Sequence, residues 1–145
     1  MLGGWLTNET SVKDICAFAV KVYSDRDLDG FKGDPDFVEN DYACKAFSKL
    51  RSSIAGIYAW RLNKAKSPEE QKAMVKEADF AFRQAFALCP YSPEAVFRYV
   101  NLLLSLGRVD DALTLADTTC KIEPTNGQFQ NLGEELKRIQ RQQKR

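Results

Sequence analysis

The sequence predicts an all-α fold built from antiparallel helices, and three observations support this prediction. Apolar residues recur at intervals of three and four along most of the 145 residues, which places them on one face of a helix. Several segments begin with Ser or Asp followed by Pro, a combination that favours the start of a helix. No run of alternating Val, Ile and Thr between turn residues indicates a strand.

The first predicted helix covers residues 11–24, and an acidic loop follows it at 25–36. The helix has one apolar stripe, formed by Val12, Ile15, Cys16, Ala19, Val20 and Tyr23. Ser11 precedes this stripe, and its hydroxyl can accept a hydrogen bond from the first helical turn. Asp34-Pro35 is the next start signal. The helical stretch after it is expected to break near Asn40-Asp41.

Two helix pairs are predicted next, an irregular pair within 37–91 and a regular pair within 92–125. Ser67-Pro68 and Ser92-Pro93 supply the start signals. Gly107 suits the left-handed position after a helix end. A last helix over 126–141 is expected to cap a single helical domain, because it is apolar on one face only. Its apolar residues are Phe129, Leu132, Leu136 and Ile139.

A period of 34 residues connects the two pairs. Pro90 and Pro124 are separated by this interval, and the same step carries Ala78 to Ala112. A 34-residue helix–turn–helix unit resembles the tetratricopeptide repeat (TPR). The resemblance implies antiparallel helix pairs stacked into an α-α superhelix with capping helices. In the first pair, Gly56 lies further from Ala78 than the repeat pattern requires, so longer helices are expected on both sides of the turn at 64–67.

The TPR resemblance implies that a protein or peptide partner binds the concave face, which the first helix of each pair lines. The positions on this face are Ser53, Ile54, Ile57, Trp60, Arg61, Phe97, Arg98, Asn101 and Leu104. Arg98 can pair with a carboxylate through two hydrogen bonds, and Asn101 can bind a peptide backbone. Ile57 and Trp60 can hold an apolar anchor. The alternative is that the N-terminal helix packs on Trp60 and Ile57 as ordinary core.

A narrower resemblance involves the stretches 46–54 and 82–93. They are similar to the C-terminal soluble tail of a bacterial family of large multi-pass membrane proteins. That family is of uncertain function and is related to protein O-mannosyltransferase-like glycosyltransferases. The resemblance implies a soluble domain tethered to the bacterial inner membrane, with Met1 as a cloning start. It places no catalytic residue on this chain, because the family's catalytic carboxylates lie in its membrane part.

The acidic loop is a candidate calcium site. Its first six residues, Asp25 to Gly30, match the D-x-D-x-D-G opening of a calcium-binding loop. In this interpretation the ligands are Asp25, Asp27, Asp29, Phe31 through its backbone carbonyl, and Asp36. Lys32 and Pro35 depart from the pattern. An ordinary solvated acidic turn is therefore the alternative.

Composition excludes several kinds of active site. The chain has no His, so it has no Ser-His-Asp triad and no His-bearing zinc site. It also has no GxxxxGK[ST] or GxGxxG loop for nucleotide phosphates. With 21 Lys+Arg against 20 Asp+Glu, no nucleic acid is expected as a partner. The basic C-terminus is assigned to the dipole of the last helix, with anionic lipid or nucleic acid as the alternative ligand.

The four cysteines, Cys16, Cys44, Cys89 and Cys120, are far apart in sequence and form no CxxC pair. They are expected to be small apolar core residues. Disulfide bonds remain an alternative, with three possible connectivities, and a four-Cys zinc site is disfavoured by the spacing.

The sequence therefore predicts a non-catalytic protein–protein interaction module of TPR type. No cofactor and no small-molecule substrate are expected, and membrane contact is expected only through the parent protein. A calcium-stabilised structural or regulatory helical domain is the alternative.

Overall fold

The structure is a computed structural model that describes residues 1–145 as helices joined by short connections, without strands. This confirms the all-α prediction. In chain order the elements are α1 (Val12–Ala19), a π-helical turn η1 (Val20–Ser24), α2 (Pro35–Glu39), α3 (Asp41–Leu62), α4 (Pro68–Leu88), α5 (Pro93–Ser105), α6 (Val109–Ile122) and α7 (Gly127–Gln143). None of the helices combines the length and the apolar character needed to cross a membrane.

The helix starts are set by polar side chains that precede them. Ser11, Asn40 and Ser67 each accept a hydrogen bond from the backbone N–H three residues further on, at 3.1, 3.0 and 3.1 Å. These bonds satisfy N–H groups that have no partner inside the helix. Asn40 also separates α2 from α3, as the sequence predicted. Gly107 follows α5 with a φ of +72°, a conformation that favours glycine.

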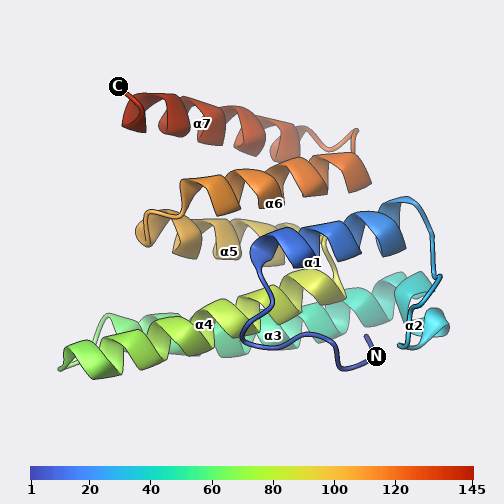
Figure 1. The fold of residues 1–145 in the computed structure, drawn as a ribbon, viewed down its shortest axis with the longest axis horizontal. Coiled ribbons are helices and arrows are strands. Elements are labelled where there is room, and N and C mark those ends of the chain that lie inside the picture. Colours follow the sequence, from blue (N-terminus) through green and yellow to red (C-terminus); the bar gives the residue numbers. More distant parts are fainter.

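Neighbouring helices run antiparallel and form a stack (Figure 1). In this stack α7 lies at one end, and α3 and α4 lie at the other. The helix α4 contacts α3 and α5, and α6 contacts α5 and α7. The first pair is the longer one, with 22 residues in α3 and 21 in α4 against 13 in α5 and 14 in α6. The α3–α4 hairpin therefore extends beyond the other helices (Figure 1).

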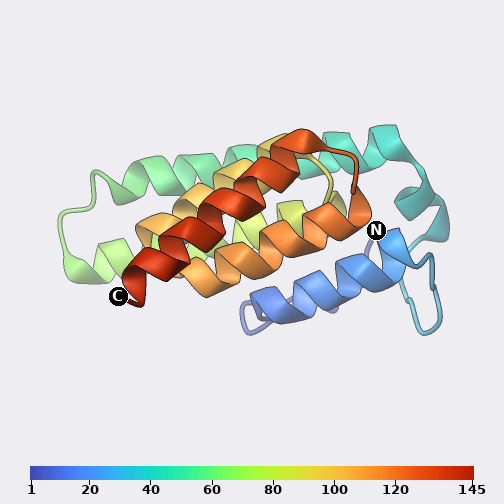
Figure 2. The ribbon, with the colours of Figure 1, turned by 90° about the horizontal axis from the view of Figure 1, so that it is seen from above.

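The N-terminal helix α1 lies against α4 and α6, on the side of the stack opposite to α3 (Figure 2). The alternative in which this helix covers Trp60 and Ile57 is therefore wrong, because these side chains are 58% and 56% exposed. One physical reason is a pair of hydrogen bonds at the end of α4. The Tyr23 hydroxyl lies within 3.1 and 3.0 Å of the carbonyls of Ala87 and Leu88, to which it donates.

An ionic cluster centred on the largely buried Asp79 joins α4, α5 and the start of α6. The Asp79 carboxylate accepts a hydrogen bond from the Tyr99 hydroxyl at 2.6 Å, and it lies 3.3 Å from the Arg83 guanidinium and 3.1 Å from that of Arg108. Arg108 also pairs with Asp111 at 2.7 Å. Burial and the charge of Asp79 raise the pKa of Tyr99 well above its usual range, so its hydroxyl remains a donor.

The same cluster holds the N-terminal segment. Arg83 donates to the backbone carbonyls of Asn8, at 3.1 Å, and of Thr10. Its side chain is 7% exposed, so its charge depends on Asp79 and on these carbonyls for stabilisation.

The second helix of each pair, α4 or α6, has a small residue on its buried face. Ala78 in α4 and Ala112 in α6 are both completely buried. A larger side chain at either position must push packed elements apart.

We expect Ala112→Leu to lower the free energy of unfolding by ~1–3 kcal/mol, because it overpacks a completely buried position. Chemical denaturation monitored by circular dichroism measures this loss. Ala73→Leu is the matched control, since Ala73 is exposed on α4, and it should change stability by less than about 0.5 kcal/mol. An unchanged Ala112→Leu stability would contradict the packing assigned to this position.

We expect Asp79→Asn to lower the free energy of unfolding by roughly 3–5 kcal/mol, because it leaves the buried Arg83 without its counter-charge. The control is Asp117→Asn, whose side chain is 55% exposed and lies 3.9 Å from Lys137. The control should change stability by less than about 1 kcal/mol. Equal losses in the two variants would show that the Asp79 cluster has no special role.

Candidate functional site

The helix α3 packs against the protein through small side chains. Its buried residues are Cys44, Ser48, Ser52 and Ala55. The distance between packed helices depends on the side chains at their contact, so small residues allow α3 to approach α4 closely. The Ser48 hydroxyl donates to the backbone carbonyl of Ala85 at 2.7 Å and so joins the two helices directly.

The large apolar side chains of α3 lie on the opposite face. We call them the outer stripe: Phe47, Leu50, Ile54, Ile57 and Trp60, which are 40%, 60%, 39%, 56% and 58% exposed. Only two other large hydrophobic residues are exposed in the whole chain, Met1 and Tyr42. An exposed apolar surface on one helix face is a candidate interaction site.

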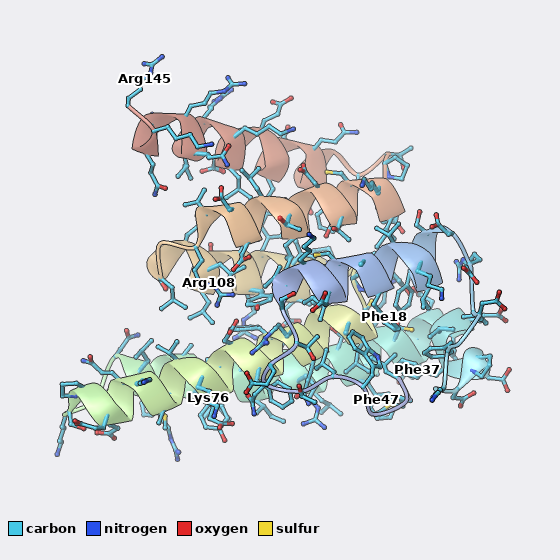
Figure 3. The ribbon with its side chains drawn as sticks, in the orientation of Figure 1. Phe18, Phe37, Phe47, Lys76, Arg108 and Arg145 are labelled. Atoms are coloured by element: carbon cyan, nitrogen blue, oxygen red, sulfur yellow. The ribbon has the colours of Figure 1, made fainter.

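The outer stripe begins beside α2. The rings of Phe37 and Phe47 lie 5.9 Å apart, centre to centre, in an edge-to-face arrangement, and both residues are labelled in Figure 3. Phe37 is buried, so this contact holds the Phe47 ring in place while part of the ring stays exposed. The outer stripe therefore starts from a supported aromatic ring.

Basic residues surround the outer stripe. The segment 42–66 has no acidic residue and six basic ones, all exposed: Lys45, Lys49, Arg51, Arg61, Lys64 and Lys66. At 3.6 residues per turn, Lys49 and Arg51 fall on opposite sides of the stripe, and Arg61 continues its line. The Lys64 ammonium lies 4.6 Å from the centre of the Trp60 ring, within the range of a cation–π contact.

The acidic residue at the start of α3 does not balance this charge. Asp41 already pairs with Lys45 at 3.0 Å. The hydrogen bond from Lys45 lowers the pKa of Asp41. The remaining cations along α3 have no acidic neighbour on their own helix, and the outer stripe therefore lies in a positively charged surface.

The predicted residues Arg98 and Asn101 line a different feature, an open hollow of about 360 Å³ between α3 and α5. Arg98 donates to the backbone carbonyl of Ser52 at 3.3 Å and to Glu94 at 3.2 Å. Its guanidinium lies over Gly56, where a Cβ atom would be 2.7 Å from Nη2. Arg98 is thus engaged within the protein, whereas the prediction assumed a free guanidinium.

The structure separates the predicted partner-binding residues into three groups. Ile54, Ile57, Trp60 and Arg61 lie together on α3, with Ser53 beside them, all exposed. Arg98 and Asn101 line the hollow between α3 and α5. Phe97 and Leu104 are half-buried, and the Phe97 ring stacks on Phe129 of α7 at 6.2 Å.

Sequence reasoning did not place Phe47 and Leu50 in the binding surface. The available signal was a second pattern in the same helix, because the small residues Cys44, Ser48 and Ser52 also recur on one face. These small residues face α4 and α5, and that packing turns Phe47 and Leu50 outward.

The acidic loop does not assemble a metal site. The expected ligands were Asp25, Asp27, Asp29, Phe31 and Asp36, but no three His, Cys, Asp or Glu side chains in the protein are gathered to hold a metal ion. Asp27 instead accepts a hydrogen bond from the Asp29 N–H at 2.9 Å, and Lys21 donates to the Asp29 carbonyl at 2.5 Å. Calcium binding remains a prediction that these contacts do not support.

All four cysteines are free thiols. Cys16, Cys44 and Cys89 are buried, as expected of core residues, and Cys120 is half-buried. Burial raises the pKa of Cys16 to about 11 and that of Cys89 to about 12. A raised pKa disfavours the thiolate, which is the nucleophilic form of cysteine. These thiols are therefore suited to packing.

The arrangement on α3 offers apolar contact area and positive charge, two features by which proteins recognise their partners.

Comparisons of the chain with protein-family models, with curated proteins and with solved structures find no match.

We expect Gly56→Ala to raise the free energy of unfolding by ~0.5–1 kcal/mol, because alanine is favoured over glycine inside a helix. The added methyl group meets only the flexible end of Arg98. Gly133→Ala in α7 is the control, because a Cβ atom there meets no other group, and it should gain a similar amount. Denaturation that shows a loss for Gly56→Ala alone would mean that Arg98 cannot move from Gly56.

Proposed function

We propose that this protein is a non-catalytic protein–protein interaction module of TPR type, and that the outer stripe is its main binding surface. The observation that carries the proposal is the exposure of five large apolar side chains on one face of α3. Removing such side chains from water contributes about 25 cal/mol per Å². A partner that covers the outer stripe gains this free energy.

The TPR assignment is supported by the 34-residue spacing and by the order of helix contacts. In this proposal α3 and α4 form the first repeat, α5 and α6 form the second, and α7 caps the stack. Each helix contacts the helix that follows it from α3 to α7, as expected for consecutive repeats. The buried positions Ala78 and Ala112 then occupy corresponding places.

The place of α1 supports the availability of the binding surface. It lies against α4 and α6, which are the second helices of the two proposed repeats. The exposed faces of α3 and α5 are consequently free of the N-terminal helix (Figure 2). The hollow lined by Arg98 and Asn101 opens between these two helices and can take polar groups of the same partner.

We also propose, from the resemblance of 46–54 and 82–93, that the module is tethered to the bacterial inner membrane through a parent protein. The reading frame upstream of Met1 tests this proposal. A frame that encodes many membrane spans is expected, and a stop codon directly upstream would contradict it.

The proposed function is tested by selecting helical peptides of about 20 residues from a display library on the full chain. We expect the selected peptides to bind Leu50→Asp/Ile57→Asp, called the stripe variant, at least roughly tenfold more weakly than the unchanged protein. The reason is that two carboxylates in the outer stripe prevent its burial. Fluorescence anisotropy measures the dissociation constants.

Asn131→Asp/Gln142→Asp is the matched control, with two carboxylates added at exposed positions of α7. It should bind the selected peptides like the unchanged protein. Peptides that bind the stripe variant equally well would show that the outer stripe is not the binding surface.

A further inference from the structure

We propose that the outer stripe binds an amphipathic helix of a separate protein, and that this helix carries acidic residues beside its own apolar stripe. The inference rests on the proposed function and specifies the chemistry of the partner. Two features of α3 support it, the spacing of the apolar residues and the sign of the charges around them.

The spacing matches a helix. Phe47, Leu50, Ile54 and Ile57 are separated by three, four and three residues, the pattern of the narrow seam between two packed helices. An extended peptide presents side chains with a period of two, which does not match this seam. Ser53 lies beside the seam and is small and exposed, so a second helix can approach there closely.

The charges select an acidic partner. Lys49 and Arg51 lie on the two sides of the seam, and Arg61 lies at its end, with no acidic residue anywhere in 42–66. In helix pairs, charges beside the apolar seam determine which partners combine. Carboxylates beside the seam of the partner complement these cations, whereas a basic helix is repelled.

A second copy of this chain does not fit the same surface. Pairing α3 with another α3 would bring together two sets of four basic residues, Lys45, Lys49, Arg51 and Arg61, and the one acid of each helix, Asp41, already pairs with Lys45. Like charges placed across an interface disfavour association. An anionic membrane would also attract the cations, but a helix lying in a bilayer surface turns its other face to water, whereas the other face of α3 packs against α4 and α5.

The position of α3 in the stack agrees with a missing helix. The opposite end of the stack is covered by α7 (Figure 1), which buries Phe129, Leu132 and Leu136 and turns polar residues outward. Stacks of helical repeats require such a polar outer helix at each end. At the α3 end the apolar side chains are exposed, and an acidic amphipathic helix would supply the polar covering there.

Two designed peptides test the inference with the full chain. Each has about three heptads with Leu at the apolar positions, flanked by Glu in the acidic peptide and by Lys in the basic peptide. Like charges keep each peptide from pairing with itself. We expect the acidic peptide to bind at least roughly tenfold more tightly than the basic one. Its affinity should fall as the NaCl concentration rises from about 50 to about 300 mM.

Charge reversal is the decisive variant. Arg51→Glu/Arg61→Glu should exchange the preference, so that the basic peptide binds more tightly than the acidic one. The matched control Lys137→Glu/Arg138→Glu alters exposed positions of α7 and should keep the preference for the acidic peptide. The stripe variant should bind neither peptide, and an unchanged circular dichroism melt confirms that each variant is folded.

The possible failures are distinguishable. Equal affinity for the two peptides, with loss of both in the stripe variant, would overturn the acidic partner and leave the proposed function intact. Failure of both designed peptides and of the display selection would overturn both. Vesicles of anionic phospholipid that bind the unchanged protein in place of any peptide would assign the outer stripe to a membrane. A dimer in sedimentation that the stripe variant loses would assign it to a second copy.

Discussion

One largely buried carboxylate connects several parts of the architecture. Asp79 of α4 neutralises Arg83 and Arg108 and accepts the Tyr99 hydroxyl, so it joins three helices that are separate in sequence. Through Arg83 it also binds the carbonyls of the N-terminal segment. These hydrogen bonds hold the N-terminal segment against α4, and α1, which follows the segment, lies on α4 and α6. The outer face of α3 is thus left uncovered by α1, which is held on the other side.

A second constraint is the close contact between α3 and α4. The buried side chains of α3 are all small, and α4 meets its neighbours with fully buried alanines such as Ala78 and Ala85. Close packing of this kind gains dispersion contacts along the length of the helices, and the bulky buried side chain at this contact, Phe82, comes from α4. The bulky residues of α3 are therefore on its outer face. The outer stripe is thus a consequence of the packing of α3 against α4.

The local features of the fold could be predicted from the sequence, and the choice between competing faces could not. The helix starts at Ser11, Asn40 and Ser67 are predictable because each hydrogen bond joins residues only three positions apart in the chain. The place of α1 depends on contacts between distant residues, such as Tyr23 with Leu88 and Arg83 with Thr10, 73 residues away, and no local pattern encodes them. Likewise, α3 contains a small stripe and a large stripe. Deciding which one is buried requires knowing the surface of its neighbour α4, which combines buried alanines with Phe82.

The outer helices at the two ends of the stack differ in the polarity of the face that they turn to water. A stack of amphipathic helices must finish with a helix whose outer face is polar, and α7 does so with residues that contact water. At the other end α3 has an apolar seam, which is unfavourable to leave in water, and unbalanced cations, which disfavour self-pairing. Apolar area favours association with many partners, whereas the charge beside it repels the basic ones. Affinity and selectivity thus come from different residues of one helix, and the surface can discriminate among amphipathic helices without a deep pocket.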